Sequence, residues 1–233
     1  MRRRPFLLLP LLACAVAMDD PTEARQRMVD EQLAGRDITD EAVLSAMRRV
    51  PRHRFVAPEQ QRFAYADHPL PIGFGATISQ PYVVARMTQL AQVRPGDRVL
   101  DVGTGSGYQA AVLAELGAEV YSVEIVPELA GSAAALLREL GYTRVQVRTG
   151  DGYAGWPERA PFAAILVAAA APALPRPLTD QLAVGGRLVI PVGRDVQDLM
   201  ILEKRPGGAL HTEHVMPVRF VPMTGAVERH PPN

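Results

Sequence analysis

The chain has 233 residues, of which 48% are hydrophobic and 21% are charged, and this is enough apolar sequence to bury one sizeable core. Its 25 Lys and Arg residues balance 25 Asp and Glu residues, and Lys204 is the only lysine, so no broad basic field exists and no nucleic-acid partner is expected. The single cysteine, Cys14, excludes an intrachain disulfide and a cysteine-based zinc site.

Residues 1–17 begin with an arginine cluster followed by an apolar run, a pattern typical of a secretory signal. The run is too short to span a bilayer, which takes about 20 apolar residues, so no integral membrane span is expected. Two cleavage sites compete: a small-x-small site that ends at Ala17, and a lipobox, Leu11–Cys14, whose cysteine is lipidated. The alternative is that translation starts at Met18. In each case we expect residues 18–233 to form a single domain.

The N-terminal part of this domain has a helical pattern. From Asp20 to about Val50, the spacing of apolar residues predicts two short helices broken near Gly35. A long irregular stretch follows Pro51 and ends at Gln80-Pro81, and such a loop in a compact domain is usually functional. A helix is then expected over Tyr82–Leu90, with Pro81 in its first turn. The candidates for burial in the first two helices are Met28, Leu33, Ile38, Val43, Leu44 and Met47.

Beyond residue 97, apolar runs alternate with amphipathic segments, which is the pattern of a parallel sheet with helices on its faces. The expected strands are Arg98–Val102, Glu119–Val123, Arg144–Arg148, Ala163–Ala168 and Gly186–Pro191, and the expected helices are Tyr108–Leu116, Pro127–Leu140 and Arg176–Leu182. Asp198–Lys204 and Val215–Met223 predict two more strands in an antiparallel hairpin at one sheet edge. The predicted fold is α/β: a doubly wound, mostly parallel sheet with a helical N-terminal segment and antiparallel C-terminal edge strands.

The strongest motif is a buried strand, a glycine-rich turn and the start of a helix, Val99-Leu100-Asp101-Val102-Gly103-Thr104-Gly105-Ser106-Gly107-Tyr108. Glycines let the backbone turn tightly and approach a ligand, and a helix N-terminus favours anionic or polar groups. The third glycine stands at position 107, whereas the dinucleotide fingerprint G-x-G-x-x-G would place it at 108. A nicotinamide or flavin dinucleotide is therefore disfavoured.

Acidic residues follow the next two predicted strands. Glu124 comes after the second strand, where a carboxylate can accept both hydroxyls of a ribose; the alternative is a surface glutamate that caps the next helix. Asp151, within Gly150-Asp151-Gly152, comes after the third strand and can accept from an adenine amino group; the alternative is a plain Asp-Gly turn. Because the carboxyl ends of parallel strands meet in one crevice, the turn and both acids together predict a site for S-adenosylmethionine.

From about residue 22 to residue 224, the sequence resembles the protein-L-isoaspartate O-methyltransferase family, which belongs to the class I methyltransferases. The glycine turn is shared by many methyltransferases, whereas the segment Thr77-Ile78-Ser79-Gln80-Pro81 is nearly specific to this family. The segments that carry the resemblance are Val50–Val56, Leu70–Gly75, Thr77–Pro81, Gly103–Tyr108, Val123–Glu124, Gly150–Gly152, Pro161–Phe162, Gly185–Pro191 and Val218–Pro222.

The resemblance implies methyl transfer from S-adenosylmethionine to the free α-carboxylate of L-isoaspartyl residues in damaged proteins and peptides. The ester formed collapses to a succinimide, which reopens partly to normal aspartate. The resemblance also implies that Ser79 is the active-site residue and positions the substrate carboxylate or the cofactor; from the residues alone, an N-cap of the helix at Pro81 is the alternative. The residues expected at the cofactor are Thr77, Ile78, Gln80, Asp101, Gly103, Thr104, Gly105, Ser106, Gly107, Glu124, Asp151, Gly152 and Thr224.

The sequence departs from the family at three alanines, and each departure removes a polar group. The family usually has glutamine at Ala76, aspartate at Ala163 and threonine at Ala168. Ala163 lies early in its predicted strand, which indicates a packing difference. Ala76 and Ala168 border the expected pocket, so these two positions bear on substrate affinity.

The remaining polar candidates are weaker. His211 and His214 have a spacing that rarely holds a metal unaided, so solvated histidines are the favoured interpretation and no metal is expected. His68 is expected to shape the substrate loop rather than to catalyse. Trp156, the only tryptophan, is expected to be a hydrophobic anchor behind the loop at Asp151.

Two other functions stay open at this point. A methyltransferase for nucleic-acid bases or small molecules would use the same fold, but Ala168–Pro172 offers no polar or aromatic group to contact a base. A non-catalytic or altered-specificity S-adenosylmethionine-binding protein of the cell envelope is supported by the signal-like start and opposed by the complete Thr77–Pro81 segment. We expect a cytoplasmic monomer, and export or lipid anchoring through Cys14 is the alternative.

Overall fold

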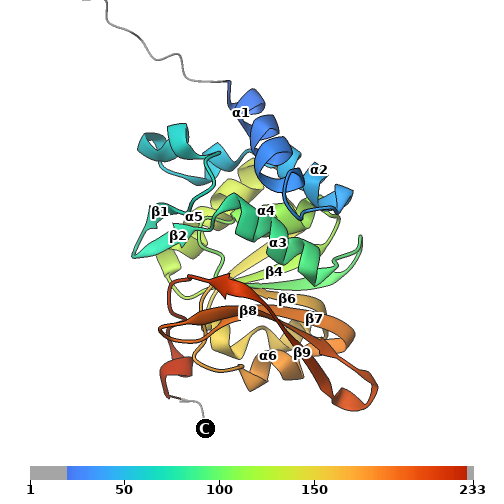
Figure 1. Ribbon diagram of the computed structural model, residues 1–233. Coiled ribbons are helices and arrows are strands. Elements are labelled where there is room, and N and C mark those ends of the chain that lie inside the picture. Colours follow the sequence, from blue (N-terminus) through green and yellow to red (C-terminus); the bar gives the residue numbers. More distant parts are fainter. Residues whose placement is uncertain (1–19, 230–233) are drawn as a thin grey trace, which may run out of the picture.

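The computed structural model describes residues 20–229, which form a seven-stranded sheet with helices on both faces (Figure 1). The strand order is β5-β4-β3-β6-β7-β8-β9, in which the first five are parallel and β8 and β9 are antiparallel to their neighbours. The predicted fold class is therefore confirmed. The strands are β3 Arg98–Val102, β4 Glu119–Glu124, β5 Val145–Thr149, β6 Phe162–Val167, β7 Leu182–Val192, β8 Gln197–Lys204 and β9 Leu210–Val218. The candidate signal segment with Cys14 lies outside the described residues.

Helices α3 to α5 lie on one face of the sheet, and the short α6 lies on the other (Figure 1). Two buried clusters follow this division: one joins the N-terminal helices, α3 and α4 to the sheet, and the other lies between the sheet and α6. These four helices are α3 Pro81–Ala91, α4 Tyr108–Glu115, α5 Pro127–Glu139 and α6 Arg176–Asp180. Their predicted positions are confirmed to within two residues at each end.

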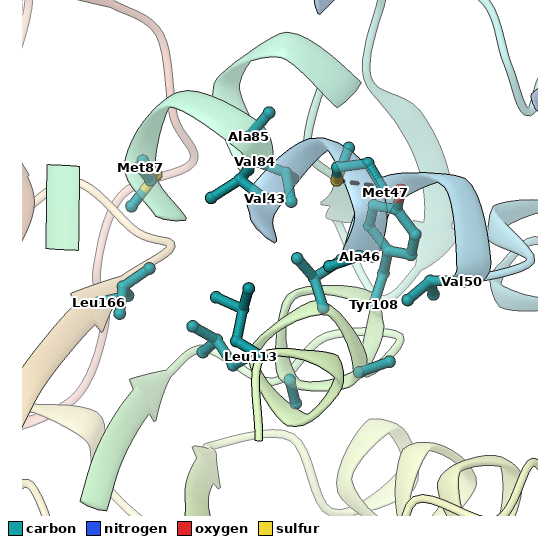
Figure 2. Packing of buried hydrophobic residues seen from close by; sticks show 14 of the residues in the cluster. Val43, Ala46, Met47, Val50, Val84, Ala85, Met87, Tyr108, Leu113 and Leu166 are labelled. Carbon is teal, nitrogen blue, oxygen red and sulfur yellow. Dashed lines mark hydrogen bonds between the residues drawn. The ribbon is translucent and has the colours of Figure 1, made fainter. Parts of the chain in front are cut away.

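The N-terminal region forms a further helical layer outside α3 and α4, made of α1 (Pro21–Arg27), the π-helix η1 (Met28–Ala34) and α2 (Glu41–Arg49). All six residues predicted to be buried there are buried. Figure 2 shows how Val43, Ala46 and Met47 of α2 face Val84 of α3 and Leu113 of α4. The Tyr108 hydroxyl donates to the Met47 sulfur at 3.7 Å. This packing ties the N-terminal layer to α4, the helix that begins directly after the glycine turn.

The stretch predicted to be irregular after Pro51 is instead built from short elements, so that prediction was wrong. It contains the 3₁₀ helices η2 (Arg52–Phe55) and η3 (Pro58–Phe63) and a hairpin of β1 (Leu70–Gly73) with β2 (Ala76–Ile78). Phe74 at the hairpin tip has a φ of 53°, between two glycines that also have positive φ. Elements of three to six residues are too short to show a periodicity in the sequence.

The last predicted strand was misplaced: β9 is Leu210–Val218, not Val215–Met223. Its first residues are exposed because β9 is the edge strand of the sheet, so they lack the apolar pattern of a buried strand. Residues 219–223 leave the hairpin and cross the ends of the parallel strands. There the Ala170 N–H donates to the Val221 carbonyl and the Met223 N–H donates to the Ala170 carbonyl, both at 2.8 Å. This crossing places the C-terminal segment beside the site described next.

Candidate active site

A cavity of about 320 Å³ opens at the carboxyl ends of β3, β4 and β6, where the open-sheet rule expects a ligand. Its walls include the β1–β2 hairpin with the residue after it, the glycine turn and the first residues of α4, and two residues of α3. The start of the loop after β4, residues just after β5 and β6, and the C-terminal crossing segment complete them. Of the predicted site residues, the lining includes Thr77, Ile78, Ser79, Gly103, Thr104, Gly105, Ser106, Glu124, Gly152 and Thr224. Gln80, Asp101, Gly107 and Asp151 are not part of this lining.

The glycine turn is held by hydrogen bonds to the neighbouring strand β4. The N–H groups of Gly103 and Thr104 both donate to the Val123 carbonyl, at 2.9 and 3.3 Å. Gly103 has a φ of 90°, and a Cβ at this position would stand 3.5 Å from the Ala168 Cβ across the cavity wall. Gly107 also has a φ of 90° and is the N-cap residue of α4, packed toward Leu137 rather than toward the cavity. The turn is therefore set by the fold and leaves its backbone accessible to a ligand.

Glu124 ends β4 and is 6% exposed, at the edge of the cavity. One of its carboxylate oxygens accepts from the Gly105 N–H at 2.8 Å, and the other accepts from the Val126 N–H at 3.0 Å. The second bond supports the entry to α5, so the helix-capping alternative describes part of its role. A carboxylate accepts up to about four hydrogen bonds, so Glu124 keeps the capacity to accept from two hydroxyl groups in the cavity.

Asp101 lies behind the glycine turn and has no exposed surface. Its Oδ2 accepts from the Ser122 hydroxyl at 2.6 Å, while Oδ1 has no hydrogen-bond partner among the described residues. Burial raises the pKa of Asp101 to about 7, partly offset by the Ser122 hydrogen bond, and the charge of Glu124 adds to the rise. The sequence predicted Asp101 at the cofactor. In the structure it is not part of the cavity lining and instead supports the glycine turn from the protein interior.

Asp151 is not part of the cavity lining either. Its carboxylate accepts from the Tyr153 N–H at 2.9 Å and from the Ala226 N–H at 2.7 Å, so it ties the loop after β5 to the C-terminal segment. Gly152, its neighbour, does line the cavity. Trp156 packs in the second buried cluster, edge-on to Tyr121 at a centroid distance of 5.4 Å, as expected of an anchor behind this loop.

Ser79 stands where the cavity meets a second one, of about 780 Å³, and lines both. The N-cap residue of α3 is Gln80, not Ser79, and it makes no capping bond through its side chain, so the N-cap alternative for Ser79 is wrong. The Gln80 amide lines the second cavity and donates to Asp67 at 2.8 Å. The Ser79 side chain is therefore available to a ligand that passes from one cavity to the other.

The alanines that depart from the family pattern fall as expected. Ala76 and Ala168 line the first cavity, and Ala168 also lines the second, whereas Ala163 lies on β6 away from both. Sequence reasoning missed Phe74 and Ile125, two lining residues that are 64% and 40% exposed. Large apolar side chains this exposed usually mark a binding surface, but exposure is not visible in a sequence. The available signal was position in or next to a motif: Phe74 lies within Leu70–Gly75, and Ile125 directly follows Glu124.

The charge of the cavity decides which cofactor it fits. Among residues 20–229, Glu124 is the only charged residue that lines it, and none of the lining residues is Lys, Arg or His. Phosphate groups would therefore meet no cation here, whereas a ligand with a net positive charge meets a carboxylate. S-adenosylmethionine carries a positive sulfonium and an apolar adenine with a ribose diol, and the residues present fit such a molecule: apolar walls beside one carboxylate. This site on this sheet defines a class I methyltransferase.

Comparisons with known proteins agree with this class and specify the family. The model of the protein-L-isoaspartate(D-aspartate) O-methyltransferase family matches residues 23–228, and the chain belongs to this family. It is 59% identical over 199 residues to the protein-L-isoaspartate O-methyltransferase of Gloeobacter violaceus, which covers 84% of this chain and 97% of the relative. It is also 59% identical over 230 residues to that of Opitutus terrae, which covers 96% and 98%.

Solved structures give the same result. One, titled protein-L-isoaspartate O-methyltransferase, has a TM-score of 0.79 at 26% identity and covers 88% of this chain and 67% of that one. Another, a protein-L-isoaspartate O-methyltransferase of Plasmodium falciparum in complex with S-adenosyl-L-homocysteine, has a TM-score of 0.74 at 27% identity and covers 86% and 98%. S-adenosyl-L-homocysteine, bound in that second structure, is what S-adenosylmethionine becomes once it has given up its methyl group.

Other candidate features of the sequence have simple places in the structure. His211 and His214 are exposed on β9, where they contact Glu213 and Asp198. Between residues 20 and 229, no group of three or more His, Cys, Asp or Glu side chains is arranged to hold a metal ion. In the same range, no helix combines the length and the apolar character needed to cross a membrane.

Proposed function

We propose that this protein transfers the methyl group of S-adenosylmethionine to the free α-carboxylate of L-isoaspartyl residues in damaged proteins and peptides, and so starts their repair through a succinimide. The observation that carries the proposal is the position of Ser79. Ser79 stands where the first cavity, whose described lining has a single carboxylate, meets the larger second cavity. It lies on a segment that is nearly specific to the family. Membership of the family supports the same substrate.

The chemistry needs alignment more than acid–base assistance. The cofactor supplies an electrophilic methyl group, which leaves sulfur as its bond to a carboxylate oxygen forms. A carboxylate is already a nucleophile at neutral pH, so no side chain has to remove a proton. The cavity agrees with this, because in the part of the chain that the structure describes its lining includes no His, Lys or Cys. The protein contributes to the rate by holding the two reactants in line and by excluding water.

We assign the parts of this alignment to residues of the two cavities. Glu124 accepts hydrogen bonds from the ribose hydroxyls, and the accessible backbone of the glycine turn lies beside the amino-acid part of the cofactor. The Ser79 hydroxyl donates to the substrate carboxylate and fixes the oxygen that attacks. Thr77 and Ile78 continue the same wall. The damaged peptide enters through the second cavity, past residues 216–222.

The cellular setting is part of the proposal. We propose that residues 18–233 act as a single cytoplasmic domain and as a monomer, with isoaspartyl proteins and peptides as partners and no role for nucleic acid. Among residues 20–229, those that line the first cavity include no Lys, Arg or His, so the phosphates of a nucleic acid would find no cation there. Processing of residues 1–17, through Cys14 or Ala17, would place the protein outside the cytoplasm instead. Mass spectrometry of the native N-terminus distinguishes these two cases.

The test is methyl transfer from labelled S-adenosylmethionine to two matched peptides, one with L-isoaspartate and one with normal aspartate. We expect base-labile label on the isoaspartyl peptide alone. Label on both peptides would contradict the stated substrate. If neither peptide is labelled although the protein binds the cofactor, it is a binding protein of altered specificity, and the proposal is wrong.

A further inference from the structure

Ser122 is a polar residue in the middle of the buried strand β4, where its neighbours Tyr121 and Val123 belong to the apolar core. It has no exposed surface, so its hydroxyl has to find partners inside the protein. It has two: Asp101 Oδ2 at 2.6 Å and the Thr104 hydroxyl at 2.5 Å. Ser122 therefore joins a carboxylate behind the glycine turn to a side chain of the turn itself.

The chemistry of Asp101, Ser122 and Thr104 decides which hydroxyl donates in each of the two hydrogen bonds. An ionised carboxylate only accepts, so the Ser122 proton points to Asp101. A hydroxyl has a single proton, and the Thr104 proton is consequently directed to the Ser122 oxygen. The backbone of Thr104 is paired as well, through its N–H to Val123 and its carbonyl to Gly107. Thr104 is a lining residue of the cavity, and the hydrogen-bonding capacity that its side chain retains is a lone pair on its hydroxyl oxygen.

We propose that Ser122 is a positioning residue that holds the Thr104 hydroxyl as a hydrogen-bond acceptor for the α-ammonium group of S-adenosylmethionine. A lone pair selects a donor, and because the ribose hydroxyls of this cofactor are assigned to Glu124, the remaining donors are its neutral adenine amino group and its cationic α-ammonium group. The buried Asp101 carboxylate, two hydrogen bonds away, favours a cationic donor over a neutral one. The inference depends on the proposed function only through the identity of the cofactor.

The charge on this chain of hydrogen bonds varies with pH. Asp101 faces Ser122 on β4 and Leu166 on β6, and Glu124 is the other charged group that acts on it. Burial raises the pKa of Asp101 to about 7, so the carboxylate loses its proton as the pH rises through neutrality. Affinity for a ligand with the ammonium group should therefore increase across the same range, and affinity for a ligand without it should not.

The experiment is isothermal titration of S-adenosylhomocysteine and of its deamino analogue, in which hydrogen replaces the α-amino group, into the wild type and variants. Thr104→Val removes the hydroxyl at constant shape, and Thr104→Ser retains it. We expect Thr104→Val and Ser122→Ala to lower the affinity for S-adenosylhomocysteine about tenfold, as for one lost hydrogen bond to a charged group. The affinity for the deamino analogue should fall less than about twofold. Thr104→Ser should restore the preference for the amino group.

The matched control is Thr179→Val, which deletes another buried threonine hydroxyl, bonded to the Arg176 carbonyl in α6, far from the cavity. It should change neither affinity. An equal loss for both ligands in Thr104→Val, or no loss for either, would overturn the proposal. If Ser122→Ala fails to fold, the Thr104 pair still decides the question. Absence of methyl transfer to the isoaspartyl peptide contradicts the proposed function and leaves this binding measurement intact.

Discussion

The two walls of the main cavity are built in different ways. On the glycine-turn wall, the N–H groups of Gly103, Thr104 and Gly105 are all bound to β4, so the wall has its final shape before a ligand arrives. On the second wall, to which the segment before α3 and the C-terminal segment contribute, the side chains of Ser79 and Thr224 make no hydrogen bond to another residue in the range 20–229, and Thr224 is exposed. The first wall is preorganised for one cofactor, and the second keeps polar groups available for a variable peptide.

The largest effect is expected on the preorganised wall, from Glu124→Ala. The substitution removes the acceptor for the ribose hydroxyls and leaves the Gly105 N–H without its partner. We expect the affinity for S-adenosylhomocysteine to fall by about two orders of magnitude, as for the loss of two hydrogen bonds to a charged group. Titration calorimetry measures this, with Glu128→Ala, an exposed glutamate of α5, as the control. A loss no greater than in the control would contradict the role of Glu124.

Asp101→Asn tests whether the same wall is held from behind by a buried acid. Burial raises the pKa of Asp101 to about 7, above its ordinary value of 3.8, so the folded protein keeps this proton longer than the unfolded chain. The contribution of Asp101 to the free energy of unfolding is fully present below its ordinary pKa and is lost as the pH rises through about 7.

Asp101→Asn has no such titration, so the wild type should lose about 2 kcal/mol of unfolding free energy relative to the variant between pH 5 and pH 8. Chemical denaturation at the two pH values measures the difference. If the two proteins differ by the same amount at both pH values, Asp101 does not titrate in this range.

Ser79→Ala probes the wall that keeps its polar groups free. Because the Ser79 hydroxyl makes no hydrogen bond to another described residue, its removal should change the unfolding free energy by less than about 0.5 kcal/mol. Methyl transfer to the isoaspartyl peptide should fall about tenfold, since the attacking oxygen loses one charge-assisted hydrogen bond. The affinity for S-adenosylhomocysteine is the internal control and should stay constant. If the variant instead loses affinity for S-adenosylhomocysteine while the rate of methyl transfer at saturating cofactor stays the same, Ser79 contacts the cofactor and not the substrate carboxylate.

The smallest effect is expected where this chain departs from its family. Ala168→Thr restores a hydroxyl at a position that lines both cavities. We expect KM for the isoaspartyl peptide to fall by about twofold to fivefold, with kcat little changed, as for one exposed hydrogen bond. Ala163→Asp, on β6 outside both cavities, is the control and should not lower KM. A higher KM in Ala168→Thr would indicate that the methyl group fills space the peptide needs.

The two walls also differ in how far a sequence predicts them. Gly103, Gly105 and Glu124 follow from strand ends and spacing, because parallel strands bring their carboxyl ends together by rule. Ser79 was identified only through the resemblance, since its segment is a short hairpin exit without periodicity.

Asp101 and Asp151 were assigned to the cofactor because both lie near strand ends. In the structure neither residue is part of the cavity lining: Asp101 accepts from the Ser122 hydroxyl and Asp151 from the Ala226 N–H, and a place in the chain does not predict such partners. Phe74 was not predicted as a site residue for a similar reason, because only the folded hairpin places it at the cavity.

The most direct test of the two-wall account is a crystal structure with S-adenosylhomocysteine and an isoaspartyl peptide bound together. We expect the ribose to lie against Glu124 in the first cavity and the isoaspartyl carboxylate to lie within hydrogen-bond distance of the Ser79 hydroxyl, with the rest of the peptide along the second cavity. A peptide carboxylate bound away from Ser79, or a ribose that does not contact Glu124, would contradict it.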